Sequence, residues 1–203
     1  MLYADDTIIF GETQKDLQNS LNSLSNYCHE WDLKVNTSKT KIVVFSRGKI
    51  RNIPIFHFGD VNIEVVDHYN YLGIVFNYNG NFKKAQKRLY DQANKAMFSL
   101  ITKARRLSLP IDIQLDLFNT LVMPIMTYGC EVWGFENCQL AEKLHLRFCK
   151  IILKCNSSTA TCMVLGELGH FPVSNHIKAK IVNYWAKIIN MKQHRLNKIL
   201  YPT

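Results

Sequence analysis

Two adjacent acidic residues near the start of the chain, Asp5 and Asp6, are the first candidates for chemistry. They follow Leu2-Tyr3-Ala4 and precede Thr7-Ile8-Ile9-Phe10, so the pattern predicts two short strands joined at a hairpin tip that carries both carboxylates. Like charges this close are unfavourable unless a cation lies between them, and carboxylates are ligands that Mg²⁺ prefers. A solvated turn rich in Asp would give the same pair. The pair alone leaves both interpretations open.

The elements that must position this hairpin are predicted from the spacing of apolar residues. Thr13 and Asp16 form a capping-box start for a helix whose apolar face is Leu17, Leu21, Leu24, Cys28 and Trp31. We expect further strands over residues 42–45, 55–58, 61–66 and 69–76, with Gly59-Asp60 as the turn between the second and third. The first 80 residues therefore predict an α+β fold, one helix packed on a mostly antiparallel sheet.

Strand patterns end near residue 80, and helical spacing replaces them. Residues 82–107 predict a long helix whose apolar positions are Ala85, Leu89, Ala93, Met97, Leu100 and Ala104. A second helix is expected from Pro110 towards Pro124, and further helices over residues 140–153 and 174–191. We place the boundary between a mixed and an all-helical part near residue 80.

The charge is unevenly distributed along the chain. Residues 1–80 carry 7 basic and 9 acidic residues, whereas residues 81–203 carry 18 basic and 7 acidic residues, within an overall net charge of +9. A basic second half predicts a polyanionic partner such as nucleic acid, although solubility alone could also explain it. The longest apolar stretch, residues 121–130, is about half a membrane span, so we expect no membrane association. Acids at the N-terminus argue against a targeting presequence and predict an intracellular protein of the cytoplasm or nucleus.

No two of the six cysteines are separated by two residues, so the sequence contains no Cys-x-x-Cys motif of a redox pair or a zinc knuckle. The looser set Cys149, Cys155, Cys162 and His170 matches no zinc spacing. We expect buried, reduced thiols that behave as small hydrophobic residues, and no disulfide-linked partner.

Several blocks in fixed order resemble the reverse transcriptases of non-long-terminal-repeat retrotransposons. Tyr3-Ala4-Asp5-Asp6 resembles the catalytic hairpin of the polymerase palm. Residues 31–45, from Trp31 through Asn36-Thr37-Ser38-Lys39-Thr40 to Phe45, resemble the motif that follows it, and Tyr71-Leu72-Gly73 is similar to the primer grip. Residues 128–133, Tyr-Gly-Cys-Glu-Val-Trp, and Glu167-Leu168-Gly169 with Pro172 are similar to segments downstream of the palm.

This resemblance implies template-directed nucleotidyl transfer with two Mg²⁺ ions in the complete enzyme. Asp5 would be the principal metal ligand and Asp6 would support it. Lys39 would lie near the phosphates of the incoming nucleotide, or would be an ordinary surface lysine. The residues that would contact substrate or primer are Tyr3, Ala4, Asn36, Tyr71, Leu72 and Gly73, although Asn36 also fits a turn-forming role and Tyr71 and Leu72 a place in the core.

The resemblance also implies a domain order and partners. Residues 1–80 would be the C-terminal half of the palm, residues 81–135 a helical thumb, and residues 136–203 a C-terminal helical extension. The expected partners are an RNA template, a DNA primer and nucleotides. The nucleic-acid contacts would be Lys83, Lys84, Lys87, Arg88, Lys95, Arg105 and Arg106, along a helix that also carries Lys103, or this would be a solvated polar face.

One departure from the family pattern limits the expected activity. The family also uses an aspartate from an earlier palm strand and upstream finger residues, for which the segment before Asp5 has no room. We therefore expect a fragment that is inactive alone. The alternative is a non-catalytic nucleic-acid-binding module derived from a retroelement, in which the basic helices bind and the two aspartates have lost their role.

Overall fold

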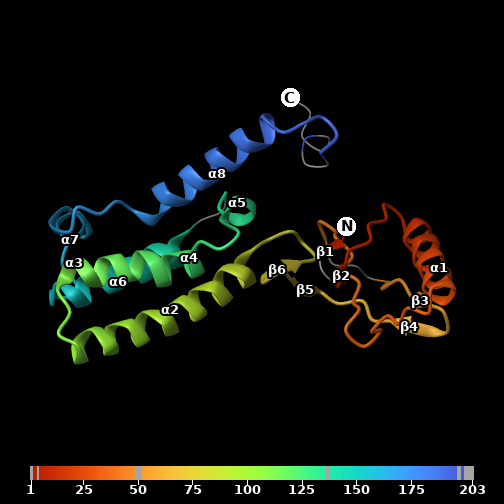
Figure 1. The fold of residues 1–203 in the computed structure, drawn as a ribbon, viewed down its shortest axis with the longest axis horizontal. Coiled ribbons are helices and arrows are strands. Elements are labelled where there is room, and N and C mark those ends of the chain that lie inside the picture. The colour runs from red at the N-terminus through yellow and green to blue at the C-terminus, as the bar shows by residue number, and fades with distance from the viewer. Residues whose placement is uncertain (1, 4, 49–51, 136–137, 196–197, 199–203) are drawn as a thin grey trace. The chain divides into compact units, whose positions relative to one another are not determined.

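The computed structural model of the chain describes residues 2–3, 5–48, 52–135, 138–195 and 198 (Figure 1). It divides into two compact units, Met1–Asn81 and Phe82–Thr203. The first unit mixes short strands with one helix, and the described part of the second unit is helical. No helix of the described chain is long and apolar enough to cross a membrane. The α+β class expected from the sequence is therefore confirmed.

The first unit contains three antiparallel hairpins among its described residues. They are β1 (Leu2–Tyr3) with β2 (Asp6–Thr7), β3 (Phe56–Phe58) with β4 (Val61–Ile63), and β5 (His68–Tyr71) with β6 (Ile74–Asn77). The expected single sheet is wrong for the described residues, because each hairpin forms its own two-stranded sheet. Gly59, at φ 55°, supplies the turn between β3 and β4 that the sequence predicts.

Helix α1 (Gln14–Glu30) begins where the capping box predicts. The Thr13 hydroxyl accepts a hydrogen bond from the Asp16 backbone N–H at 3.1 Å, which satisfies one of the open donors of the first turn. Leu21 and Cys28 are buried, but Trp31 is 62% exposed. The expectation that Trp31 continues the buried face is wrong, because the helix ends at Glu30 and Trp31 caps it.

The core of the first unit joins α1 to the β3–β4 hairpin. Leu21, Ile42, Phe56 and Ile63 are buried together there. The amide of Gln18 fixes the alignment, since its Nε2 donates to the His57 carbonyl at 2.8 Å and its Oε1 accepts from the His57 N–H at 3.0 Å. This one side chain satisfies both backbone groups of a residue on an edge strand, which keeps that edge from pairing elsewhere.

Three strand predictions in the first unit need correction. Residues 42–45 form no strand, and only Ile42 among them forms a β-bridge, with Val65. The Ile42 N–H donates to the Glu64 carbonyl, and the Ile42 carbonyl accepts from the Val66 N–H. Residues 69–76 form two strands rather than one, because Leu72 (φ 46°) and Gly73 (φ 83°) make a two-residue turn. Positive φ at both central residues is the type I′ hairpin turn. Residues 8–10 follow β2 without being part of it.

Helix α2 (Lys83–Arg106) is the central helix against which several others of the second unit pack. The six apolar positions expected from the sequence are all buried, from Ala85 to Ala104, and Ile101 joins them. This helix packs against α4 (Met123–Met126), η1 (Phe118–Val122), α6 (Gln139–Ile152) and α3 (Ile111–Leu117). The predicted helices over residues 140–153 and 174–191 are confirmed as α6 and α8 (Val173–Ile189). The short helices α5 (Cys130–Trp133) and α7 (Thr161–Glu167) were not predicted.

The segment from Pro110 to Pro124 is helical throughout, but one stretch is wider than an α-helix. The residues of η1 form a π-helix between α3 and α4, which ends two residues before Pro124. Proline has no N–H and its ring clashes with the carbonyl four residues earlier, so a locally widened turn lets the helix continue past it. The Thr120 hydroxyl also donates to the Asp116 carbonyl in this stretch. Phe118 and Val122 are thereby placed in the core, both fully buried.

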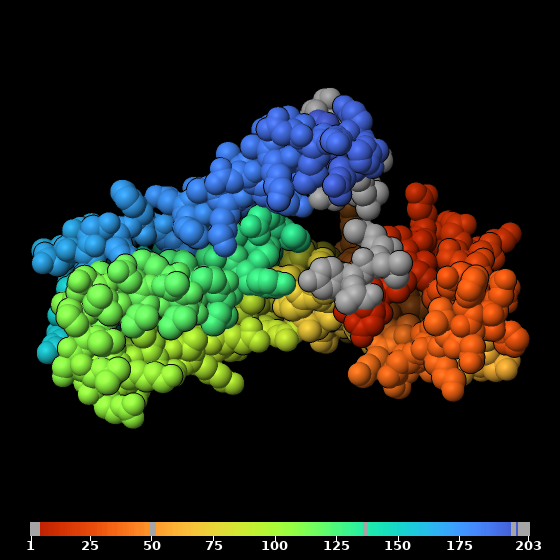
Figure 2. Space-filling model, viewed as in Figure 1, coloured from red at the N-terminus to blue at the C-terminus, as the bar shows by residue number. Residues whose placement is uncertain are grey.

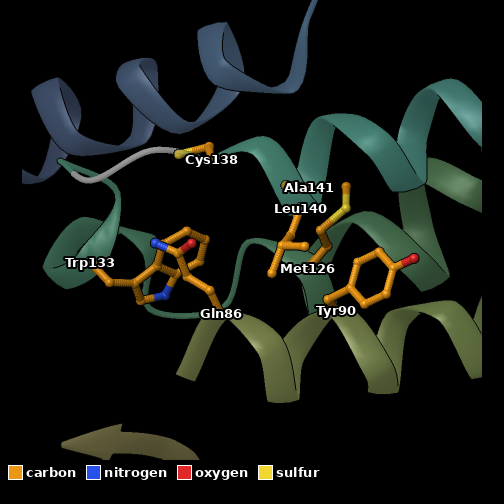
Figure 3. A pocket seen from close by; sticks show the side chains of 7 residues that line it. All are labelled: Gln86, Tyr90, Met126, Trp133, Cys138, Leu140 and Ala141. Carbon is orange, nitrogen blue, oxygen red and sulfur yellow. The ribbon is translucent and has the colours of Figure 1, made fainter. Parts of the chain in front are cut away.

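The sequence block Tyr128 to Trp133 has a structural explanation in this unit. Gly129 precedes α5 with φ 62°, a conformation that favours glycine, and so lets the chain turn between α4 and α5. Cys130 and Trp133 then point into the core, and the Trp133 indole N–H donates to the Tyr128 carbonyl at 2.8 Å. Figure 3 shows Trp133 beside Gln86 of α2, and Tyr90 farther along the same helix beside Met126. These side chains line a cavity of about 10 Å³. That volume holds at most one water, so this is packing rather than a ligand site.

Gly134, at the end of α5, has no side chain and so allows α5 and α8 to approach closely. Adding a side chain there is therefore expected to lower the free energy of unfolding. A Cβ at this position would lie 2.5 Å from Ile177 Cγ2 and 3.0 Å from Ile181 Cδ1, and would also contact the Cys130 carbonyl. We expect Gly134→Ala to lower the free energy of unfolding by about 1–3 kcal/mol, because overpacking forces neighbouring groups to move. Urea unfolding followed by circular dichroism measures this change.

The matched control for that substitution is Gly166→Ala in α7. A Cβ there would meet nothing within 4 Å. Because alanine favours helix over glycine, this control should be neutral or stabilising by about 0.5–1 kcal/mol. Equal stabilities of the two variants would contradict close packing of α5 on α8.

Candidate active site and nucleic-acid interface

The aspartate pair lies on the β1–β2 hairpin, as the sequence predicts. Leu2 pairs with Thr7 and Tyr3 pairs with Asp6, so the connection between the strands is two residues long and contains Asp5. Asp6 begins β2, and both aspartates are exposed. Ala4, the other residue of the connection, lies outside the described residues, as do the side chain of Tyr3 and its contacts. The hairpin therefore presents two neighbouring carboxylates to solvent.

The donor chemistry of this tip fits a hard divalent cation, which prefers carboxylate oxygens and retains several waters. Two carboxylates are nevertheless an incomplete set for a pair of metal ions. Across the described residues, neither Asp5 nor Asp6 belongs to a group of three or more His, Cys, Asp or Glu side chains that could share an ion. The tip can contribute two carboxylate ligands to a metal site.

Asn36 organises the loop that carries Lys39. The Asn36 side-chain oxygen accepts hydrogen bonds from the Ser38 hydroxyl at 2.6 Å and from the Lys39 N–H at 3.2 Å. Its backbone carbonyl accepts from the Lys39 N–H and from both the N–H and the hydroxyl of Thr40. The turn-forming role that the sequence suggests for Asn36 is therefore confirmed. The Lys39 side chain is exposed, on a loop with a fixed backbone.

The Lys39 loop is also tied to the β5–β6 hairpin. The Tyr69 hydroxyl donates to the Lys39 carbonyl at 3.3 Å. On the same hairpin, Tyr71 pairs with Ile74, and Leu72 and Gly73 form the tip. Leu72 is a β-unbranched residue held at positive φ with its side chain 38% exposed, which costs conformational energy that an ordinary turn sequence would avoid. The block expected as one strand of the primer grip is thus a two-residue turn between β5 and β6.

Helix α2 presents the basic residues on its outer side. Lys83, Lys84, Lys87 and Lys95 are exposed and Arg88 is half-buried, and together with Asp91 and Gln92 they line a shallow open groove. Lys103, Arg105 and Arg106 continue the exposed positive charge to the end of the helix. Only Asp91 opposes it, paired with Lys87 at 2.8 Å. This pairing raises the pKa of Lys87, so that amine stays charged.

The aromatic residues of α2 are packing residues in this structure. Lys87 Nζ lies 5.1 Å from the centre of the Tyr90 ring, and Tyr90 lines the small cavity beside Met126. Phe98 is partly exposed, but the Arg147 guanidinium covers its ring at 4.8 Å. Both rings are therefore in contact with other side chains of the helical unit.

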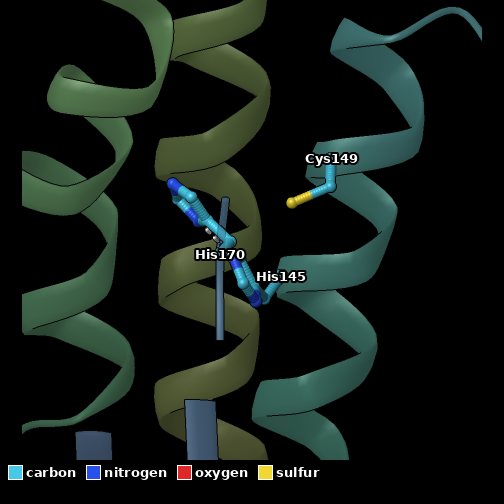
Figure 4. A group of neighbouring side chains, drawn as sticks. All are labelled: His145, Cys149 and His170. Carbon is cyan, nitrogen blue, oxygen red and sulfur yellow. Dashed lines mark hydrogen bonds between the residues drawn. The ribbon is translucent and has the colours of Figure 1, made fainter. Parts of the chain in front are cut away.

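A third cluster, not found from the sequence, lies in the second unit. His145 and Cys149 of α6 meet His170, and their ligand atoms all lie within 4.8 Å of one another (Figure 4). Burial, together with the charge of His170, lowers the pKa of His145 to about 4, and burial raises the pKa of the Cys149 thiol to about 12. Cys155 and Cys162, which the sequence grouped with Cys149 and His170, do not belong to this cluster. His145 was not predicted from the sequence, although its spacing of four residues from Cys149 places both side chains on one face of α6.

Comparison with known proteins finds a family similarity in the first unit. Residues 1–76 match the family described as "Reverse transcriptase (RNA-dependent DNA polymerase)". This match and the named relatives support a relationship of the chain to retrotransposon reverse transcriptases. The matched region contains the aspartate hairpin, the Asn36 turn and the β5–β6 tip. No solved structure matches the chain significantly.

Three curated relatives extend the similarity. An uncharacterized transposon-derived protein of Caenorhabditis elegans is 27% identical over 71% of this chain and 51% of its own length. The probable RNA-directed DNA polymerases from transposon BS and transposon X-element of Drosophila melanogaster are 26% and 25% identical over 75% and 54% of this chain.

Those matches also define how much of a relative the chain represents. It spans about half the length of the nematode protein, 18% of the BS protein and 12% of the X-element protein. Coverage of 71% and 75% of this chain exceeds what either unit alone contains, so the similarity includes residues of both units.

Proposed function

We propose that this chain takes part in template-directed DNA synthesis on RNA, as a portion of a non-long-terminal-repeat retrotransposon reverse transcriptase. The observation that carries the proposal is the position of Asp5 and Asp6 at an exposed hairpin tip inside the region that matches the family. On this proposal residues 1–80 form the C-terminal half of the palm, residues 81–135 the thumb, and residues 136–203 a helical extension. Its partners would be an RNA template, a DNA primer and nucleotides, and its reaction would take place in the cytoplasm, the nucleus or both.

Asp5 and Asp6 would hold Mg²⁺, with Asp5 the principal ligand. Their carboxylate oxygens and open surroundings suit an ion that keeps part of its water shell. When bound, the ions supply positive charge that favours attack by the primer 3′ hydroxyl and departure of pyrophosphate. The hairpin contributes by holding Asp5 in its connection and Asp6 at the start of β2, so the two neighbouring carboxylates need little ordering when the nucleotide arrives.

Lys39 and the β5–β6 tip would position the remaining groups. The Asn36 hydrogen bonds fix the backbone of the Lys39 loop, so the exposed ammonium can sit beside the triphosphate and neutralise its charge. The tip at Leu72-Gly73, whose residues have φ 46° and φ 83°, would support the primer end. The hydrogen bond from Tyr69 to the Lys39 carbonyl links these two sites in one unit.

Helix α2 would bind the phosphate backbone of the template–primer duplex. Its exposed cations are arranged on one side, opposite the seven residues buried in the core. Lysine and arginine contacts to phosphate give affinity without sequence preference, which suits an enzyme that moves along its template.

We further propose that the 203-residue chain alone extends no primer. Two-metal transfer needs more carboxylate ligands than the tip provides, and the described residues bring no third His, Cys, Asp or Glu ligand to it. The test is primer extension on an RNA template with Mg²⁺, comparing this chain with a version that continues upstream of Met1 in the same reading frame. The proposal predicts extension by the longer version only. If neither version extends a primer, a non-catalytic nucleic-acid-binding module becomes the better account.

A further inference from the structure

The cluster of His145, Cys149 and His170 lies in the helical unit, on different residues from those assigned to polymerisation. His145 and Cys149 are four residues apart on α6 and so occupy the same face of the helix. His170 lies in the connection between α7 and α8, and its Nδ1 is 3.1 Å from His145 Nε2. Figure 4 shows the Cys149 side chain directed from α6 toward the two rings.

The connection that carries His170 is held against α6 by the surrounding backbone. The His170 N–H donates to the Leu165 carbonyl at 2.9 Å, and Gly169 turns the chain at φ 63°. Just beyond, the Glu142 carboxylate accepts hydrogen bonds from the N–H groups of Val173 at 3.1 Å and Ser174 at 2.7 Å. Glu142 thereby caps α8 from a position one turn before His145, so the meeting of the three side chains is built into the packing.

The cluster is buried and one of its polar atoms has no partner. His145 is 1% exposed and Cys149 is fully buried, while His170 is half-buried and lies toward the surface. The His145 ring stacks on Phe118, with ring centres 5.7 Å apart. Its Nδ1 is buried with no hydrogen-bond partner among the described residues. Buried polar atoms are usually satisfied, so the histidine pair is an incompletely satisfied polar cluster, and the Cys149 thiol is a third possible ligand within 4.8 Å of it.

The donor set and its dimensions suit zinc. Two imidazole nitrogens and one thiolate are ligands that Zn²⁺ binds, at about 2.0–2.1 Å from nitrogen and about 2.3 Å from sulfur. In a tetrahedral site these bond lengths place two nitrogens roughly 3.3 Å apart, and nitrogen and sulfur roughly 3.6 Å apart. The observed nitrogen pair is at 3.1 Å and all three ligand atoms lie within 4.8 Å. Small side-chain movements would close the set around one ion.

We propose that His145, Cys149 and His170 bind one Zn²⁺ ion, which fastens the α7–α8 connection to α6. Binding replaces the thiol proton of Cys149, which leaves for solvent, with a sulfur–zinc bond, and both histidines bind as neutral rings. A water molecule completes the fourth position on the side of half-buried His170. The ion joins segments that are distant in sequence, so its role is to stabilise the helical unit.

The test is metal binding by the full 203-residue chain, produced without a histidine tag and stripped of metal. We expect one equivalent of Zn²⁺ to bind and to raise the Tm by several degrees. Titration with Co²⁺ in place of Zn²⁺ should give a thiolate-to-cobalt charge-transfer band and the visible absorption of a tetrahedral site, and added Zn²⁺ should abolish both.

Three variants assign the site. Cys149→Ala should lose the charge-transfer band, and His170→Ala, at a half-buried position, should weaken Co²⁺ binding by at least about tenfold. Cys155→Ser is the matched control, because Cys155 is a thiol of the same unit outside the cluster, and it should bind as the original chain does. Circular dichroism checks that each variant is folded. Absence of the charge-transfer band in the unmodified chain would overturn the proposal, as would full metal binding by Cys149→Ala.

Discussion

Asp5→Asn, introduced into a version of the chain that continues upstream and extends primers, should reduce the rate of nucleotide addition by about 10³-fold or more. The substitution keeps the shape of the hairpin tip but removes one of its two negative charges. Metal ions contribute several kcal/mol of charge stabilisation to such a reaction, and each 1.36 kcal/mol is a factor of ten in rate. Single-turnover primer extension with Mg²⁺ measures the effect.

Asp60→Asn is the matched control for this prediction. Asp60 is also an exposed aspartate at a hairpin turn of the same unit, between β3 and β4. It belongs to a different hairpin from Asp5 and Asp6 and is more than 50 residues away in the sequence. Its activity should stay within about twofold of the original. Asp6→Asn should reduce the rate less than Asp5→Asn does. A variant at Asp5 that keeps a tenth or more of the activity would contradict its assignment as the principal metal ligand.

The second large effect is expected on nucleic-acid binding by α2. Replacing Lys84, Lys87, Arg88 and Lys95 together with Gln removes four cations from the groove. Each phosphate contact contributes about 0.9 to the slope of log affinity against log salt, so the slope should fall by about 3–4. At roughly 0.1 M salt the affinity for a primer–template duplex should drop by about 10²–10³-fold. Fluorescence anisotropy at several salt concentrations measures both quantities.

The control variant must carry the same change in net charge. Lys15, Lys34, Lys143 and Lys187 are exposed lysines outside the groove, and replacing all four with Gln lowers the net charge equally. If binding follows net charge alone, both variants weaken alike and the assignment of α2 is wrong. If α2 is the interface, only the groove variant shows a large decrease in the slope of log affinity against log salt.

The helices could be predicted from the sequence largely because they are amphipathic. The apolar positions of α2 recur every three or four residues and are all buried, and its ends were placed within a residue or two. Helices α5 and α7 are too short to show a repeating pattern. The passage of a helix through Pro124 depends on a wide turn that no propensity scale describes.

The strands were harder to predict, and the reasons are local. Leu72 sits at positive φ inside a run of β-favouring residues, so the run hides the turn and was read as one strand. The β-branched residues after Ile42 have strand propensity, but only Ile42 is bridged there, and propensity does not create a pairing partner. The Thr13 cap and the Gly59 turn, by contrast, can be predicted from the sequence. Each depends on the local preference of one residue, the capping hydroxyl of Thr13 and the positive φ that Gly59 adopts.

The candidate sites divide in the same way. The aspartate hairpin and the Asn36 turn are local, so their residue order alone predicts their geometry. The His145 cluster joins residues separated by up to 25 positions, and only the packing of α6 against the α7–α8 connection reveals it. Sequence spacing could suggest Cys149 and His170, but it paired them with the wrong cysteines.

Copying of an RNA template is the central claim, and the identity of the added nucleotide tests it most directly. The longer version of the chain is given a thymidine primer on an adenine homopolymer of RNA, with Mg²⁺ and one deoxynucleoside triphosphate at a time. The account predicts addition of thymidylate only, and no addition when Asp5 is replaced with Asn. Equal addition of all four nucleotides, or addition that persists without the template, would contradict it.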